Sequence, residues 1–341
     1  MATSPGRSGT PTDPLFIIGT ERSGSNLLRL VLDAHPHITV PHPPHVMNYF
    51  GGLEDRYGDL EQAGPRRALA ADIAHLVAIH IHPWDITPHI DRMVADAQPK
   101  DLFGLFLALY AQHLESTSAR RWGCKSTFMI HHVDRILARF PNAGLLWLVR
   151  DPRDVAVSAR KSVFSPCAPR LSARLWARQQ AQGLALQARI GDRVHRMHYE
   201  DLVSRPEPTI RAACHHLGED FHPAMLRFSE TTSARKIAKM MDSWKNADAG
   251  FLKNNTEKWR TRLSPVELAA VEEEAGEQME ALGYARATDA GAPIADPFLY
   301  LREARLRAKV EWTSLRSDAN HWKRWRRRAF LTRLDARTRL P

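Results

Sequence analysis

The sequence lacks the features that mark membrane-spanning, disulfide-stapled and zinc-binding proteins. It has no run of about 18 or more apolar residues, so no transmembrane helix is expected. Its cysteines number only three, Cys124, Cys167 and Cys214, and neither their spacing nor their odd count indicates a zinc site or a disulfide framework. Residues 1–13 are rich in Pro, Gly, Ser and Thr and lack an apolar core, so we expect a disordered leader rather than a secretory signal. These absences favour a cytoplasmic protein.

Excess positive charge is scarce outside the C-terminal region. The formal net charge is +10, and residues 297–341 hold 13 Lys or Arg against 4 Asp or Glu, an excess of +9. The rest of the chain is therefore nearly neutral, which argues against nucleic-acid binding by the main domain. A small polyanionic ligand would still be compatible with it, because such a ligand needs only a few well-placed cations.

The stretch Leu15–Pro36 predicts an anion site, because a short apolar strand runs through a loop of small residues into a helix. The spacing of Gly19 and Gly24 fits the ATP-binding loop G-x-x-x-x-G-K-[ST]. However, Ser25 stands where that loop has its lysine, and Asn26 stands where it has its metal-binding hydroxyl. Arg22 supplies a cation instead. The pattern indicates a modified phosphate loop that works without Mg²⁺.

A second pattern begins at the apolar run Gly144–Arg150, which is typical of a buried parallel strand. Asp151 is a good N-cap, and the following proline suits the first position of a helix over 152–161. Ser158 lies on this helix, eight residues after Arg150. An arginine at the carboxyl end of a strand and a serine on the next helix can converge on one ligand.

These patterns together identify the chain as similar to a known family. Arg22–Leu28 resembles the 5′-phosphosulfate loop of sulfotransferases that use 3′-phosphoadenosine 5′-phosphosulfate (PAPS), and Leu148–Ser158 resembles their 3′-phosphate motif. Tyr199–Leu202 and Asn254–Arg260 resemble two weaker signatures. The resemblance implies a P-loop-type three-layer α/β domain over residues 14–288, with a mainly parallel sheet flanked by helices. It also implies transfer of a sulfuryl group from PAPS to a hydroxyl or amine, with release of adenosine 3′,5′-bisphosphate (PAP) and with no metal required.

The resemblance assigns roles to individual residues. The backbone amides of Ser23–Leu27 are expected to hold the 5′-phosphate, and Arg22 is expected to neutralise the leaving group. The 3′-phosphate is expected to be bound by Arg150 and Ser158. Tyr199 is expected to lie near the adenine. The full set of expected cofactor contacts is Arg22, Ser23, Gly24, Ser25, Asn26, Leu27, Arg150, Ser158, Tyr199 and Lys258.

The general base departs from the family pattern. Many relatives carry a glutamate after the first helix, and the matching position here is Pro43. We therefore expect a histidine base, His45 in preference to His42, held by the rigid prolines around it. Lys125 ends a strand similar to the family's Gly-x-Lys-[Ser/Thr] segment and is expected to stabilise the transferring sulfonate, although Thr127 replaces the usual proline.

The acceptor is expected to be a small molecule or a glycan, and Tyr49, Phe50 and Trp84 are candidate walls of its pocket. The segment 231–256, with Lys236, Lys239, Lys245 and Lys253, is expected to be irregular and to cover the cofactor. The histidine pair His80 and His82 is a weak candidate for metal binding, because no third ligand stands at a recognisable spacing.

The C-terminal region is expected to be a linker over 289–297 followed by a basic amphipathic helical extension over 298–341. Its helix, about Phe298–Thr338, would dock on the main domain or a partner, or lie on an anionic membrane surface, and the third alternative is that the region is disordered. Two other functions stay open. One is an ATP-dependent small-molecule kinase, and the other is a catalytically inactive nucleotide-binding or membrane-surface protein on the same fold.

Overall fold

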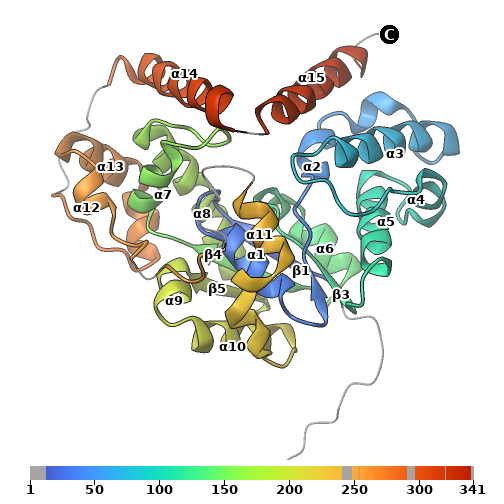
Figure 1. The fold of residues 1–341 in the computed structure, drawn as a ribbon, viewed down its shortest axis with the longest axis horizontal. Coiled ribbons are helices and arrows are strands. Elements are labelled where there is room, and N and C mark those ends of the chain that lie inside the picture. The colour runs from blue at the N-terminus through green and yellow to red at the C-terminus, as the bar shows by residue number, and fades with distance from the viewer. Residues whose placement is uncertain (1–12, 240–247, 253, 290–295, 319, 339–341) are drawn as a thin grey trace, which may run out of the picture.

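The computed structural model describes residues 13–239, 248–252, 254–289, 296–318 and 320–338. Lys245, Lys253, most of the expected linker and nearly all of the expected leader lie outside these ranges. A five-stranded parallel sheet forms the centre of the molecule (Figure 1). Its strands, in spatial order, are β2 (Ile38–Thr39), β3 (Arg121–Cys124), β1 (Leu15–Gly19), β4 (Gly144–Val149) and β5 (Val194–His198).

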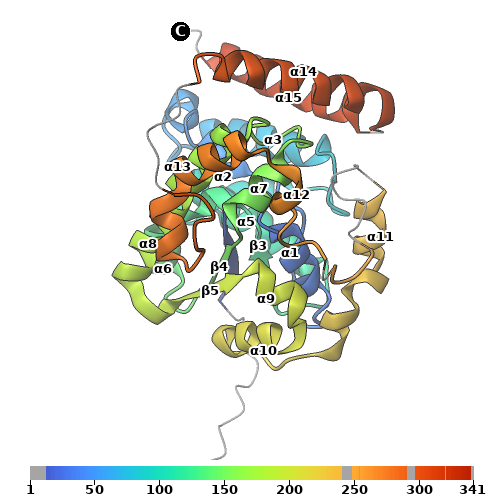
Figure 2. The same cartoon turned by 90° about the vertical axis from the view of Figure 1, so that its left-hand side faces the viewer.

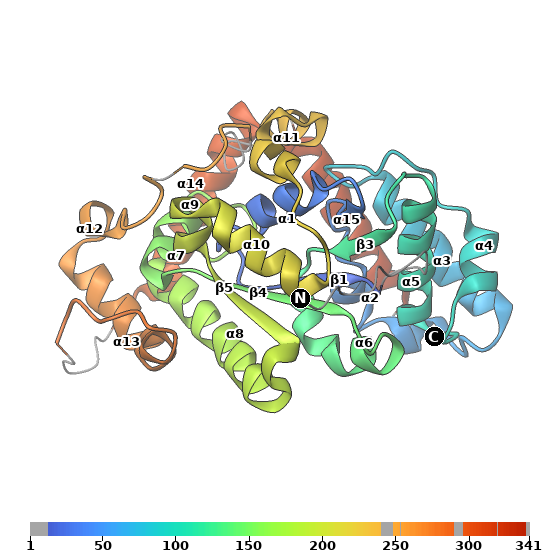
Figure 3. The ribbon, with the colours of Figure 1, turned by 90° about the horizontal axis from the view of Figure 1, so that it is seen from below.

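Helices cover both faces of this sheet. Alternate residues of a strand point to opposite faces, and β1 and β4 accordingly supply two separate cores. Phe16 and Trp147 belong to the core on one face, while Ile17 and Leu148 belong to the core on the other. Seen from below, α8 and α6 lie on one side of the strands and α1, α9 and α10 on the other (Figure 3). The predicted three-layer α/β fold with a parallel sheet is confirmed.

The α-helices are, in chain order, α1 (Ser25–Asp33), α2 (Val46–Phe50), α3 (Ala63–Ala78), α4 (Ile90–Asp96), α5 (Leu102–Glu115), α6 (Val133–Arg139), α7 (Pro152–Ala159), α8 (Pro169–Ile190), α9 (Tyr199–Ser204), α10 (Pro206–Leu217), α11 (Thr232–Ala238), α12 (Trp259–Arg262), α13 (Pro265–Ala281), α14 (Leu299–Ser317) and α15 (His321–Thr338).

Local sequence signals fix the helix that carries the second motif. The carboxylate of Asp151 accepts a hydrogen bond of 2.8 Å from the backbone N–H of Arg153, and Pro152 occupies the first helical position of α7. The helix is held in place by Arg153, which pairs with Asp151 and with Glu272 of α13 at 2.7 and 2.8 Å. All three side chains are buried, so this network clamps α7 between the sheet and α13.

Two expectations about the C-terminal half are wrong. The segment 231–256 is not wholly irregular, because the hydroxyl of Thr231 accepts a hydrogen bond from the backbone N–H of Ala234 and so begins α11. The extension is not one helix but two, α14 and α15. Between them, Asp318 adopts an extended backbone and its carboxylate accepts a hydrogen bond of 2.8 Å from the N–H of Asn320, a local bond that competes with helix continuation.

The two C-terminal helices lie together across one end of the domain (Figures 1 and 2). On α15, Phe330 packs against His75 of α3 with ring centroids 4.8 Å apart, and Leu334 is buried in the core. On α14, the carboxylate of Glu303 accepts hydrogen bonds from the backbone N–H groups of Cys167 and Ala168. None of the described helices combines the length and the apolar character needed to cross a membrane.

Candidate active site

A cavity of about 840 Å³ opens beyond the carboxyl ends of β1 and β4, where parallel sheets usually bind their ligands. Among the described residues, eight Lys or Arg side chains line it, and the acidic ones are Glu21 and Asp154. The basic residues are Arg22, Lys125, Arg150, Arg160, Lys161, Lys258, Arg262 and Arg327. This excess of cations suits a ligand with several negative charges.

The predicted phosphate loop forms one wall of the cavity. Gly24 has φ 90° and ends the loop, and α1 starts at Ser25, so the N–H groups of Ser25, Asn26 and Leu27 belong to a first helical turn that lacks intrahelical acceptors. These four residues all line the cavity. Ser23 does not, since it is fully buried and its N–H donates to the carbonyl of Thr20. The amide of Ser23 is therefore occupied, contrary to expectation.

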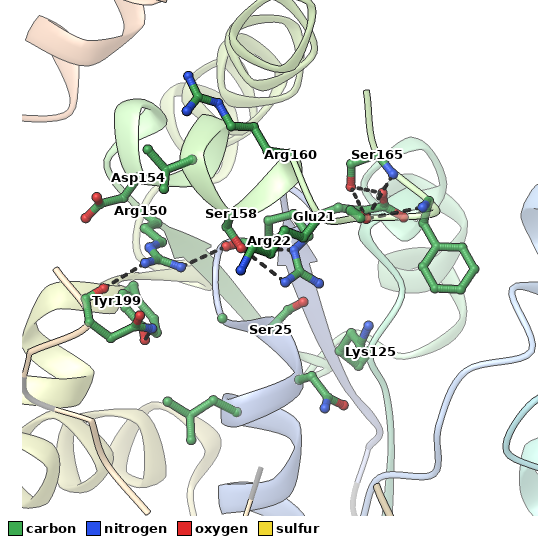
Figure 4. Close-up of a pocket in the computed structure, with 18 of the residues that line it drawn as sticks. Glu21, Arg22, Ser25, Lys125, Arg150, Asp154, Ser158, Arg160, Ser165 and Tyr199 are labelled. Atoms are coloured by element: carbon green, nitrogen blue, oxygen red, sulfur yellow. Dashed lines mark hydrogen bonds between the residues drawn. The ribbon is translucent and has the colours of Figure 1, made fainter. Parts of the chain in front are cut away.

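The two predicted motifs meet at Arg22. Its guanidinium donates two hydrogen bonds of 3.1 Å to the hydroxyl of Ser158, and the carbonyl of Arg22 accepts one of 3.1 Å from Arg150 (Figure 4). Burial lowers the pKa of Arg22, and the neighbouring charge of Arg150 lowers it further. Arg22 thus joins the two motifs at one wall of the cavity.

Tyr199 and the late segment complete this end of the cavity. The guanidinium carbon of Arg150 lies 4.2 Å from the centroid of the Tyr199 ring, and a second N–H of Arg150 donates to the carbonyl of Asn255 at 2.8 Å. Asn255 in turn accepts a hydrogen bond from Lys258 and donates one to the hydroxyl of Tyr199. One connected group thus contains Arg150, Tyr199 and Lys258, which belong to three separate motifs of the sequence.

His45 lies in the same cavity, and its Nδ1 is 3.0 Å from the hydroxyl of Ser126. This contact leaves Nε2 as the other nitrogen available for proton transfer. Burial is the main cause of a pKa well below 6.5 for His45, and the charge of Lys125 adds to it, so the imidazole is neutral at pH 7. His42 also lines the cavity, but its side chain is buried against His80 and His82.

Lys125 also lines the cavity, and in Figure 4 it lies on the opposite side of Arg22 from Arg150 and Tyr199. Burial lowers its pKa to about 8, and the carboxylate of Glu21 opposes this shift. Glu21 also accepts a hydrogen bond of 3.0 Å from the hydroxyl of Ser165, so its carboxylate has a fixed position near the lysine. Lys125 is thus a cation held near the loop at neutral pH.

Backbone strain coincides with this cavity. Among the described residues, those other than glycine with a positive φ are Arg22 at 69°, His45 at 55° and Glu257 at 54°. For L-residues this conformation costs roughly 1 kcal/mol or more. The first two line the cavity, and the third is next to Lys258, which does so as well. Strain held at three points around one cavity points to a functional site.

Several lining residues carried no recognised signal in the sequence. Phe164 and Arg262 come from segments far from the loop in sequence, and Arg327 comes from α15. Of the three aromatic residues proposed as acceptor walls, only Tyr49 lines the cavity, because Phe50 and Trp84 are buried in the core. Within the described residues, no three His, Cys, Asp or Glu side chains are arranged to hold a metal ion.

Comparisons with known proteins agree on one family. The model of the sulfotransferase family matches residues 14–223, more than half of the chain. The nodulation protein NoeE of Sinorhizobium fredii (strain NBRC 101917 / NGR234) is 26% identical over 329 residues, which cover 88% of this chain and 73% of that protein.

Two solved structures share the fold. The sulfotransferase domain from the curacin biosynthetic pathway has a TM-score of 0.56 at 20% identity, covering 80% of this chain and 98% of that one. The sulfotransferase domain of the Synechococcus PCC 7002 olefin synthase has a TM-score of 0.55 at 23% identity, covering 83% and 99%.

Proposed function

The chain belongs to the sulfotransferase family, and we propose that it transfers a sulfuryl group from PAPS to a hydroxyl or amine of a small-molecule or glycan acceptor. The observation that carries this proposal is the contact between the two motifs, in which Arg22 binds Ser158 and Arg150 binds Arg22 beside one basic cavity. A nucleotide with phosphates at both the 3′ and 5′ positions needs two anion sites on one wall.

The cofactor would be bound mainly by fixed positive groups. The N–H groups of Ser25, Asn26 and Leu27 would receive the 5′-phosphate at the start of α1. Arg150 would bind the 3′-phosphate, helped by Ser158, whose hydroxyl Arg22 already orients. Tyr199, whose ring lies against the guanidinium of Arg150, would contact the adenine of the cofactor. Neither a P-loop lysine nor a metal-binding hydroxyl follows Gly24, so we propose that binding needs no metal.

The transfer itself would be an in-line displacement at sulfur. The acceptor oxygen forms a bond to sulfur, the bond from sulfur to the bridging oxygen of the 5′-phosphate breaks, and PAP leaves with the electron pair. The acceptor proton passes to Nε2 of His45, whose neutral ring is oriented by Ser126. Lys125 and Arg22 would stabilise the negative charge on the sulfonate and on the leaving oxygen.

The test of cofactor choice is calorimetric titration of the full-length protein with PAP in EDTA, and with ATP in Mg²⁺. We expect PAP to bind without metal and Arg150→Ala to weaken it by roughly 10- to 100-fold, as for the loss of a charged hydrogen bond. The control is Arg178→Ala, which removes the same charge from an exposed position of α8 outside the cavity. Binding of Mg²⁺-ATP but not PAP would overturn the proposal in favour of a kinase.

For localisation we propose a cytoplasmic protein that attaches to anionic membrane surfaces through α14 and α15. The supporting observation is that Trp312, Trp322 and Trp325 remain exposed on these helices beside their many arginines. Exposed tryptophans next to cations are typical of helices that lie at a membrane interface.

A further inference from the structure

Arg327 is the one cavity-lining residue that comes from the C-terminal helices, within the part of the chain that the structure describes. It lies on α15, and only 8% of it is exposed. Its neighbours Arg326 and Arg328 are exposed, as expected for a basic helix in water. Arg327 is thus turned inward, into the cavity, while the charges beside it face solvent.

The guanidinium of Arg327 has aromatic neighbours in place of a carboxylate. Its carbon lies 5.8 Å from the centroid of the Tyr49 ring and 5.7 Å from that of Phe164, and no hydrogen bond or ion pair joins it to another described residue. Other buried arginines of this protein donate to fixed acceptors. Arg153 contacts Asp151 and Glu272, and Arg66 donates to the backbone carbonyl of Glu61.

Arg327 faces the cavity with no carboxylate beside it, and the two aromatic rings contact it only through cation–π interactions. A cation kept in this state beside a cavity indicates that its counter-ion arrives with a ligand. Arg150 would also receive an anion, but it already donates to the carbonyls of Arg22 and Asn255, whereas Arg327 donates to no described residue.

Arg327 is close to the candidate base. Tyr49 is a neighbour of both, with its ring 6.3 Å from that of His45 and 5.8 Å from the guanidinium carbon of Arg327. After burial and the charge of Lys125, the charge of Arg327 is one of the causes that lower the pKa of His45. Of the groups assigned to the 3′-phosphate, Arg150 and Tyr199 contact each other and Asn255, and Ser158 contacts Arg22. No contact joins any of these groups to Arg327 within the described residues.

We propose that Arg327 binds an anionic group of the acceptor, a carboxylate, phosphate or sulfate, and so selects acceptors that carry a negative charge as well as the hydroxyl or amine to be sulfated. This inference rests on the proposed sulfotransferase function. It also gives α15 a role in the active site, since this helix supplies the side chain that would recognise the acceptor.

The experiment measures binding of two matched probes to the full-length protein saturated with PAP. The probes are 4-hydroxyphenylacetate, with a hydroxyl and a carboxylate, and 4-hydroxyphenylacetamide, of nearly the same shape but uncharged. We expect wild type to bind the anion more tightly than the amide. Arg327→Gln should weaken binding of the anion by roughly 10- to 100-fold and leave binding of the amide unchanged.

Arg328→Gln is the matched control, because it removes the same charge from the adjacent, exposed position. Arg328→Gln should bind the anion as wild type does. Equal losses of anion binding in both variants would show an effect of net charge alone and would overturn the inference. The inference is also overturned if wild type binds the two probes equally or does not bind the anion. PAP is titrated first into every variant. Failure of wild type to bind PAP rejects the proposed function, and a loss of PAP affinity in Arg327→Gln would assign this arginine to the cofactor instead.

Discussion

Gly24 faces the ring of Tyr199 so closely that a Cβ atom on Gly24 would lie 2.3 Å from Cδ2 of Tyr199. The phosphate loop and the residue at the exit of β5 are therefore in direct contact, although 175 positions separate them in the chain. Gly24 also has φ 90°, a conformation that residues with a side chain rarely adopt. Any side chain at this position must displace either the loop or the tyrosine beneath Arg150.

We predict that Gly24→Ala weakens PAP binding by at least about 10-fold, because both the strain and the clash act at the start of α1. Gly64→Ala is the matched control, since Gly64 lies within α3 with nothing within 4 Å of an added Cβ. That change should leave PAP binding unaltered and stabilise the fold by up to about 1 kcal/mol. Calorimetry and urea unfolding of both variants measure these effects, and wild-type PAP affinity in Gly24→Ala would contradict the prediction.

His45→Gln should lower kcat by about 10²- to 10⁴-fold, the usual contribution of a positioned base, and leave PAP affinity unchanged. The measurement is PAP release from PAPS with an acceptor that wild type sulfates. Ser126→Ala should cause a smaller loss, because Ser126 acts by orienting the ring, and Ser126→Thr should restore the rate. A full loss in His42→Gln, with little change in His45→Gln, would assign the base to His42.

Folding stability should decrease in mild acid. Burial lowers the pKa of His80 to about 3, whereas a histidine in the unfolded chain titrates near 6.5. Between these values the unfolded chain binds a proton that the folded protein does not, so the free energy of unfolding falls as the pH decreases from about 6.5. His80 alone accounts for a loss of about 2 kcal/mol between pH 7 and pH 5.

Urea unfolding at pH 7 and pH 5 tests this pH dependence. His80→Gln should reduce the loss of stability between pH 7 and pH 5 by about 2 kcal/mol, because glutamine does not titrate. His131→Gln at an exposed position serves as the control. An unchanged pH dependence in His80→Gln would show that the ring is accessible to protons in the folded state.

Glu272→Ala should destabilise the protein by about 3–5 kcal/mol, because it leaves the buried charge of Arg153 with one carboxylate fewer. Glu272 also accepts hydrogen bonds from the N–H groups of Ala287 and Thr288, which would lose their partner. Glu277→Ala, at an exposed position of the same helix, should change stability by less than about 0.5 kcal/mol. Equal unfolding midpoints for the two variants would contradict this account of the clamp on α7.

The protein should sediment with vesicles that contain phosphatidylserine and not with vesicles of phosphatidylcholine alone. Replacing Trp322 and Trp325 together by serine should reduce this binding, because both rings are exposed. Val266→Ser removes an exposed apolar residue from α13 and should leave binding unchanged. Equal binding of wild type to both kinds of vesicle would argue against an electrostatic contact.

Motifs that act over a few residues could be predicted from the sequence. The loop at Arg22, the strand that ends at Arg150 and the N-cap at Asp151 each depend on neighbours in the chain, and the structure places them as expected. Contacts between distant segments could not be predicted in this way. The sequence gives no indication that Asn255 would join Arg150 to Tyr199, or that Arg327 would turn inward while Arg326 and Arg328 face water.

The two errors in the C-terminal half have the same origin. The segment 231–256 contains α11, because the hydroxyl of Thr231 caps that helix by accepting a hydrogen bond from the N–H of Ala234. The extension forms two helices, because local hydrogen bonding by Asp318 competes with the helix at that point. In both cases one side-chain hydrogen bond to the backbone decides where a helix begins or ends.

The position of Arg327 in the chain has a consequence for synthesis. The segments that would hold the cofactor, including the contacts of α13 that fix α7, are complete once Thr288 has been added, whereas Arg327 is added 39 residues later. Domains fold from the N-terminus as the chain emerges from the ribosome, at about 5–20 residues per second. A nascent chain could therefore acquire its nucleotide site several seconds before the wall that selects the acceptor, and translation itself would separate the two steps of assembly.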